Sequence, residues 1–236
     1  MILNEKFIRQ HTKLDVKAVD KCVSTFDEIG KYDAIVALEQ ERGEGRGDHT
    51  FFSPRGGLYI VMRAQGLYID PHTLTPAVGL AVHDAIQVIL GIKTDIKWVN
   101  DIFCNGKKVA GILCKNVRKA EYLIGIGINY ATRQEDINAA GLAGIAGTLN
   151  APEFRVNAFT AGLLNCIRRA TIASFDFERY GSLCMNVNKT VEFTHDGVKV
   201  RGFAERIDAD GSLIVRIGAA TVSVDAGEVS IIREVV

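Results

Sequence analysis

Apolar positions recur along this chain with two different periods, which together predict an α+β fold. Short apolar runs at residues 33–39, 57–62 and 122–129 are typical of buried strands. Two longer segments, residues 77–90 and 157–173, have the spacing and length of helices. We therefore expect a sheet built from segments far apart in the sequence, with helices packed against it.

The segment 77–90 is apolar on most sides, which predicts a central and nearly buried helix. Thr75 and Pro76 suit its N-cap and first turn, and Gly91 suits its end.

The character of the chain changes near Asn188. From there, short β segments alternate with turns such as Asp196-Gly197 and Asp210-Gly211. This pattern predicts a small antiparallel barrel or sandwich appended to the larger unit. We expect two domains, 1–187 and 188–236.

Asn105-Gly106, between two apolar segments, is a strong hairpin signal. Pairing outward from that turn places Lys97, Asp101 and Lys108 on one face of the ribbon, because side chains alternate faces along a strand. Such a face is either a small charged site or the solvated side of an ordinary sheet. The expected cross-strand pairs are Cys104 with Lys107, Phe103 with Lys108, Asp101 with Ala110 and Lys97 with Cys114. Ala110 and Ile112 are expected on the same face as Lys108.

Composition narrows the classes of partner. The 236 residues are 47% hydrophobic and 24% charged, with zero formal net charge, and no basic tract appears. We therefore expect no nucleic-acid partner. We also expect no membrane span, since no apolar run looks long enough, and the first six residues lack the layout of a signal peptide.

The chain has five cysteines and no Cys-x-x-Cys pair. An odd number leaves at least one cysteine unpaired in any disulfide scheme. The pattern suits free thiols in a reducing cytoplasm, which is the localisation we expect.

Several motifs resemble those of the biotin protein ligases. Residues 43–54 (GEGRGDHTFFSP) and 56–59 (GGLY) are similar to that family's GRGRxGRxWxSPxGGLY segment. Residues 97–101 (KWVND) and 107–113 (KKVAGIL) resemble its KWPND and KxAGIL, and residues 125–129 (GIGIN) resemble its GxGIN strand. The likeness extends in order over nearly the whole chain.

The resemblance implies a mixed or antiparallel sheet flanked by helices, like the catalytic domain of class II aminoacyl-tRNA synthetases, followed by an SH3-like β-barrel. It also implies an activity: MgATP activates biotin to biotinyl-5′-AMP, and the biotinyl group passes to a lysine of a biotin carboxyl carrier protein domain. The additional helix-turn-helix of repressor-type members is not seen, so we expect no operator binding. Whether two chains form a homodimer is left open.

The resemblance also assigns residues. Lys108, Arg46 and Asp101 match the expected catalytic positions, with Asp101 a candidate ligand for Mg²⁺ or a partner of Lys108. Cations are needed there because a carboxylate must approach a triphosphate. The ATP-binding candidates are Arg46, Lys97, Asn100, Lys108 and Asn129. The biotin-binding candidates are Ser24, Thr25, Phe26, Gln40, Gly43, Glu44, Gly45, Arg46, Lys108, Gly111 and Gly125.

Plainer explanations exist for some of these residues. Ser24 or Thr25 suits the cap of a short helix, with Asp27 or Glu28 completing a capping box. Gly125 is equally consistent with close strand packing. Trp98 is expected in the core.

The chain departs from the family pattern at several positions. Glu44 replaces the first arginine of the glycine loop and brings a negative charge close to the expected phosphates, and Asp48 and His49 also make that loop less cationic. Val99 replaces a proline, which a strand should tolerate, and Phe26 replaces an asparagine. Two rival functions therefore remain: a lipoate or octanoate ligase or transferase of the same fold, and a catalytically weakened, biotin-binding relative.

Overall fold

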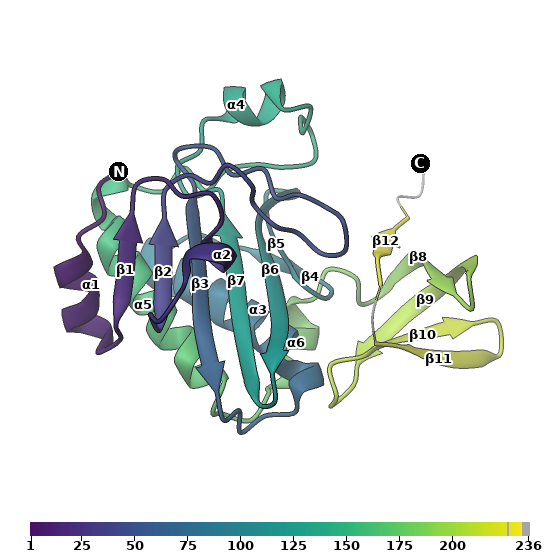
Figure 1. The fold of residues 1–236 in the computed structure, drawn as a ribbon. Helices are drawn as coiled ribbons and strands as arrows, with labels where there is room; N and C mark the ends of the chain where they lie inside the picture. The colour runs from purple at the N-terminus through teal and green to yellow at the C-terminus, as the bar shows by residue number, and fades with distance from the viewer. Residues whose placement is uncertain (226, 233–236) are drawn as a thin grey trace.

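The computed structural model describes residues 1–225 and 227–232, and its larger sheet has seven strands (Figure 1). The strand order is β1-β2-β3-β7-β6-β5-β4, in which β1 and β2 are parallel and the other neighbours are antiparallel. The sheet is therefore mixed. Its strands are β1 (Val16–Val19), β2 (Ala34–Ala37), β3 (Leu58–Gln65), β4 (Asp95–Lys97), β5 (Asp101–Cys104), β6 (Lys107–Arg118) and β7 (Glu121–Ile128).

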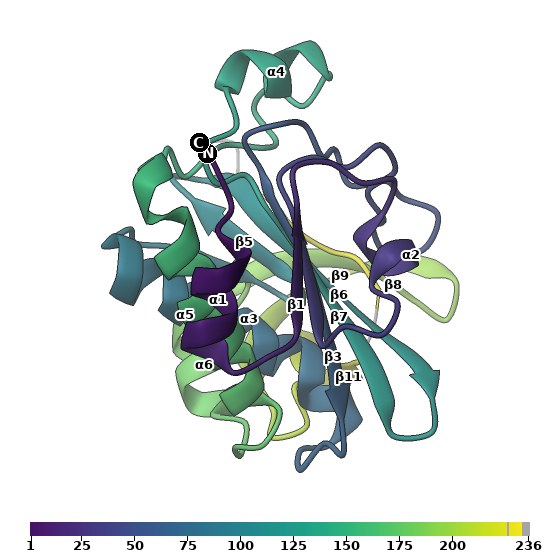
Figure 2. The same ribbon diagram turned by 60° about the vertical axis from the view of Figure 1, so that its left-hand side comes forward.

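Helices cover one face of this sheet. Figures 1 and 2 show α1, α3, α5 and α6 on that face, while the short α2 lies over the opposite face. One face therefore holds the main core under the helices, and the other carries two smaller buried clusters that include residues of α2 and the nearby loops. The helical elements are α1 (Glu5–Thr12), α2 (Thr25–Glu28), η1 (Pro71–Thr73), α3 (Leu74–Ala85), η2 (Ile86–Leu90), α4 (Gln134–Ala139), η3 (Glu153–Arg155), α5 (Val156–Ala170) and α6 (Phe177–Leu183).

The central helix is α3, continued by the π-helical turn η2. It is nearly buried, as the sequence predicts, and ends at Gly91, whose φ of 73° suits a residue without a side chain. The expected N-cap at Thr75 is wrong, because η1 begins at Pro71 and Asp70 caps it by accepting from the His72 backbone N–H.

Length and hydropathy alone would let the 20 residues Pro71–Leu90 cross a membrane, contrary to the expectation that no run is long enough. In the structure, 67% of the tested window is buried within the protein. Its apolarity therefore serves core packing against the sheet.

The Asn105-Gly106 turn forms as predicted, with Cys104 opposite Lys107 and Phe103 opposite Lys108. Beyond these pairs the register shifts, and Asp101 lies opposite Gly111 instead of Ala110. The extra residue on β6 is Val109, which forms a β-bulge.

The predicted pairing of Lys97 with Cys114 is also wrong. Lys97 ends the separate strand β4 and pairs with Asp101, and Val99 lies in the turn between β4 and β5 rather than within a strand. Ala110 and Ile112 belong to the buried core on the helix side, so Gly111 instead of these two shares a face with Lys108.

A separate five-stranded antiparallel sheet lies beside the larger one (Figure 1). The Trp98 indole donates to the Gly211 carbonyl over 2.9 Å and so joins the two parts, which confirms Trp98 as a core residue. The expected second domain, 188–236, includes Ala226 and residues 233–236, which lie outside the described residues. The strand order is β11-β10-β9-β8-β12, with β8 (Lys189–His195), β9 (Val198–Ile207), β10 (Leu213–Ile217), β11 (Ala220–Val224) and β12 (Val229–Ile231).

Candidate active site

A cavity of about 480 Å³ lies on the face of the larger sheet opposite α3 and α5. Strands β5, β6 and β7 contribute its floor, the glycine loop 43–51 contributes one wall, and residues 227–230 contribute another part of the lining. Most of the residues predicted from sequence meet here. Those that line it are Thr25, Phe26, Gln40, Glu44, Gly45, Arg46, Lys97, Asn100, Asp101, Lys108, Gly111 and Gly125.

Lys108 and Asp101 form an ion pair in this cavity. Lys108 Nζ lies 2.7 Å from Asp101 Oδ1, and their side chains are 30% and 18% exposed. The bulge at Val109 lets Lys108 and Gly111 point to the same side although three positions separate them. The interpretation of this face as a solvated surface is therefore wrong, because both charged groups are largely enclosed.

Arg46 reaches the cavity from the glycine loop. Its guanidinium donates to Asn100 Oδ1 over 3.2 Å and to the Gly227 carbonyl over 3.3 Å. The Asn100 amide in turn donates to the Ile112 carbonyl over 3.2 Å, and the Ile112 backbone N–H donates to the Asn100 carbonyl over 2.9 Å. Asn100 is thus held by β6 and orients Arg46.

A chain of polar contacts begins at α2. Both the backbone N–H and the hydroxyl of Thr25 donate to Gln40 Oε1, over 2.8 and 2.7 Å. The Gln40 amide donates to Ser53 Oγ over 3.1 Å, and the Ser53 hydroxyl donates to the Phe51 carbonyl over 2.7 Å. These contacts fasten both ends of the glycine loop to the N-terminus of α2.

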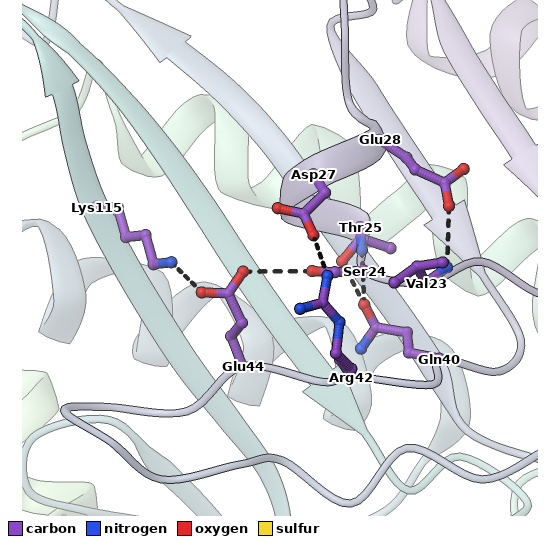
Figure 3. A network of polar contacts seen from close by, with 9 residues as sticks. All are labelled: Val23, Ser24, Thr25, Asp27, Glu28, Gln40, Arg42, Glu44 and Lys115. Carbon is purple, nitrogen blue, oxygen red and sulfur yellow. Dashed lines mark hydrogen bonds and ion pairs between the residues drawn. The ribbon is translucent and has the colours of Figure 1, made fainter.

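Ser24 occupies the N-cap position of α2, but its side chain makes no capping hydrogen bond. Its hydroxyl instead donates to Glu44 Oε1 over 3.3 Å, and Glu28 accepts from the Val23 backbone N–H (Figure 3). The plain capping explanation therefore fails for the Ser24 side chain, which is turned toward the glycine loop.

Two aromatic rings cover the bare glycines of the floor. A Cβ built on Gly127 would lie 2.5 Å from the Phe51 ring, and one on Gly111 would lie 3.0 Å from it. A Cβ on Gly125 would lie 2.4 Å from the Phe26 ring. These glycines are therefore required for close approach of aromatic side chains to the strands.

Glu44 forms an ion pair with Lys115 on β6 (Figure 3). The ammonium group of Lys115 also lies 4.3 Å from the centroid of the Phe26 ring. The negative charge that Glu44 is expected to bring close to the phosphates is therefore balanced by Lys115 in the structure.

Three predicted residues lie beside the cavity rather than in its lining. Ser24 contacts the cavity wall through Glu44, and a Cβ on Gly43 would lie 2.2 Å from Ser53 Oγ. Asn129 is 6% exposed and donates from its side chain to the Gly147 carbonyl over 2.8 Å.

Sequence reasoning missed Lys115, Phe51 and residues 227–230. Lys115 follows Gly111 and Leu113 on the cavity side of β6, so strand alternation alone could have found it. No local pattern signals that residues 227–230 return to the cavity.

Within residues 1–225 and 227–232, no group of three or more His, Cys, Asp or Glu side chains could hold a metal ion. Asp101 is a single enclosed carboxylate. One or two carboxylates together with substrate phosphates are the usual protein ligands of Mg²⁺ in nucleotide sites. Asp101 therefore fits Mg²⁺ that arrives with a nucleotide, and does not fit a metal held by protein alone.

The fold and cavity together define an α+β protein with a cavity, lined in part by Arg46, Lys97 and Lys108, on the face of a mixed sheet opposite its helices. Over residues 17–129 the sequence matches the Biotin/lipoate A/B protein ligase family. The matched residues make up somewhat less than half of the chain, and over them the chain is similar to that family.

Two curated relatives and one solved structure illustrate the likeness. A bifunctional ligase/repressor BirA of Bacillus spizizenii is 36% identical over 109 residues, which cover 43% of this chain and 34% of that protein. A biotin–[acetyl-CoA-carboxylase] ligase of Mycobacterium tuberculosis is 27% identical over 218 residues, which cover 85% of this chain and 80% of that protein.

The structure of a biotin protein ligase from Aquifex aeolicus in complex with biotin and ATP shares the fold, with a TM-score of 0.78. It is 22% identical, and the match covers 93% of this chain and 99% of that one. The match to the Bacillus protein spans only about a third of that relative.

Proposed function

We propose that this protein activates biotin with ATP to biotinyl-5′-AMP and transfers the biotinyl group to a lysine of a biotin carboxyl carrier protein. The observation that carries the proposal is the convergence of Lys108, Asp101 and Arg46 on one cavity. Related structures of this fold were solved with biotin and ATP, and with biotinyl-5-AMP.

In the first step, a carboxylate oxygen of biotin attacks the α-phosphorus of ATP, and the bond to the bridging oxygen breaks to release pyrophosphate. Both reactants are anions, and negative charge accumulates on the phosphate oxygens in the transition state. Lys108 and Arg46 offset that charge, Arg46 with the planar fork suited to two phosphate oxygens. Asp101 positions the ammonium group of Lys108.

Mg²⁺ bound to the nucleotide supplies further neutralisation of the phosphates. Asp101 is the residue that would hold it, and Lys97 and Asn100 line the same part of the cavity. Asn129 acts from outside the lining by supporting the loop at Gly147.

In the second step, the amine nitrogen of the carrier lysine attacks the carbonyl carbon of the mixed anhydride. The acyl–oxygen bond breaks, AMP leaves, and the nitrogen loses a proton as the amide forms.

Biotin requires an apolar slot with a polar end. Phe26 and Phe51 supply apolar walls above the glycine floor, and Thr25 and Gln40 supply polar groups beside it. Ser24, Gly43, Glu44 and Gly45 shape the loop that encloses this end.

The finer assignments extend the same proposal. Residues 1–187 form the catalytic domain, of the class II aminoacyl-tRNA-synthetase-like type. The described residues of the second domain, 188–236, form an SH3-like barrel that helps close the cavity. Mg²⁺ is the metal, the carrier domain is the protein partner, and the cytoplasm is the compartment.

Incubation with MgATP and biotin, octanoate or lipoate, followed by mass spectrometry of acyl-adenylates, tests the proposal. We expect biotinyl-5′-AMP and no other adduct. An octanoyl or lipoyl adenylate would replace this proposal with the lipoate-type function. Biotin binding without any adenylate would identify a non-catalytic relative.

A further inference from the structure

We propose that the Glu44–Lys115 ion pair is a positioning device that holds the glycine loop in its binding conformation and so sets the affinity for biotin. This inference rests on the proposed function. Lys115 lies outside the cavity lining and Glu44 lies on the loop that carries Arg46, so each acts through that loop.

The first argument is where Glu44 lies. It is on the glycine loop, and its two carboxylate oxygens contact different elements: one the ammonium group of Lys115 on β6, the other the hydroxyl of Ser24 at the start of α2 (Figure 3). Ser24 is only 1% exposed and gives no capping bond to its own helix. One side chain thus ties the loop to two fixed parts of the protein.

The second argument concerns Lys115. Its ammonium group lies 4.3 Å from the Phe26 ring centroid, and that ring in turn covers Gly125 of β7. Lys115 therefore contacts the loop on one side and a wall of the biotin slot on the other. Movement of the loop and the shape of the slot are coupled through this one residue.

The third argument compares the two anchors of the loop. Arg46 holds it through Asn100 and the Gly227 carbonyl, but these contacts must be exchanged when Arg46 turns to a phosphate. Glu44 has no such conflict, because its partners Ser24 and Lys115 are not part of the cavity lining. A glycine-rich loop loses much conformational entropy on ordering, so an anchor that survives ligand binding lowers the entropy cost of binding.

Lys115→Ala and Glu44→Ala should each raise the biotin Kd about fivefold, as expected for a partly exposed ion pair supported by neighbouring contacts. For Lys115→Ala, whose side chain lies outside the cavity lining, the kcat at saturating substrates should stay within about twofold, since bound ligands then hold the loop through Arg46. The double variant Glu44→Lys with Lys115→Glu should recover most of the affinity, because the pair is restored with reversed charges.

Arg42→Ala is the matched control. Arg42 also joins this loop region to α2, through Asp27, but that pair is exposed, with side chains 72% and 57% accessible (Figure 3). We expect its biotin Kd to change less than twofold. An equal loss of biotin affinity in Arg42→Ala and Lys115→Ala would overturn the inference. So would Lys115→Ala and Glu44→Ala variants that bind biotin as tightly as wild type, or a charge-reversed pair that recovers none of the lost affinity.

Amide hydrogen exchange of residues 43–51 in the ligand-free protein tests the device independently of the proposed function. The Phe51 N–H donates to the Gly43 carbonyl over 2.8 Å, and the Gly45 N–H donates to the His49 carbonyl over 2.8 Å. Lys115→Ala should speed exchange of both amides about fivefold, and Arg42→Ala should not. Unchanged exchange in Lys115→Ala would refute the device even if the protein proves to be a biotin ligase. If exchange is faster in Lys115→Ala than in wild type, but the wild type binds no biotin, the proposed function alone is refuted.

Discussion

The two faces of the larger sheet are built from the same strands but have different roles. On β7, Ile124, Ile126 and Ile128 pack into the helix-covered core and are at most 3% exposed, whereas Gly125 and Gly127 alternate with them and floor the cavity. A step of one residue therefore separates a side chain that stabilises the fold from a position that lines the cavity. Substitutions on one face should change activity, and substitutions on the other should change stability.

The largest effect is expected for Lys108→Ala on the cavity face. Loss of a cation at the developing charge should lower pyrophosphate release on the order of 10²- to 10³-fold at saturating biotin and ATP. Far-UV circular dichroism should be unchanged, because Lys108 does not pack in the core. Lys107→Ala is the control, since Lys107 lies along Gly147 outside the cavity lining. Normal pyrophosphate release from Lys108→Ala would refute the assignment.

On the helix face, Ile124→Ala should lower the free energy of unfolding by about 3 kcal/mol, because it leaves a void beneath the helices. Urea titration measures this change, and Ile124→Val should cost only about 1 kcal/mol. Both variants should keep the wild-type KM for biotin while folded. A raised KM in either variant would mean that the two faces are not independent.

Two glycine substitutions sharpen the contrast. Gly127→Ala places a methyl group 2.5 Å from the Phe51 ring, so the ring must move, and we expect the biotin Kd from calorimetry to rise about tenfold. Gly79→Ala on α3 meets only ordinary contacts, the nearest at 3.7 Å, and should stabilise the helix by up to about 1 kcal/mol. If Gly79→Ala weakened biotin binding as much as Gly127→Ala, the contrast between the faces would fail.

The smallest effect concerns pH and the buried His83 of α3, whose ring lies 2.8 Å from Thr94 Oγ1. Burial lowers the pKa of His83 below its ordinary value of about 6.5. The unfolded chain then binds more protons than the folded one, so stability is full above pH 6.5 and falls as the pH drops toward the folded pKa.

Each unit of lowering corresponds to about 1.4 kcal/mol. Urea midpoints at pH 7.5 and 5.5 should therefore differ more for wild type than for His83→Gln, whose amide can still bond Thr94. The same pH dependence in both would show that His83 is not the group responsible.

Much of this arrangement follows from local sequence. The Asn105-Gly106 turn and its first two residue pairs are set by turn geometry, and the alternation of β7 predicts its two faces. The register beyond Phe103 could not be predicted, because a bulge depends on how β6 meets both of its neighbours.

The charged partners of the loop were harder to foresee. Glu44 and Lys115 are 71 residues apart, and their contact depends on how the loop crosses the sheet. The sequence showed Glu44 as a departure from the family pattern and gave no sign of the cation that balances it. Asn129, by contrast, matches a motif well and yet supports the cavity from outside.

Residues 227–230 belong to the wall of a cavity whose other parts begin at Thr25. Ribosomes make these residues long after the strands of the floor. A nascent chain that has folded its larger sheet still presents an unfinished pocket until residue 230 has left the exit tunnel. The cavity is therefore completed late in synthesis, after most of the structural core can already have formed.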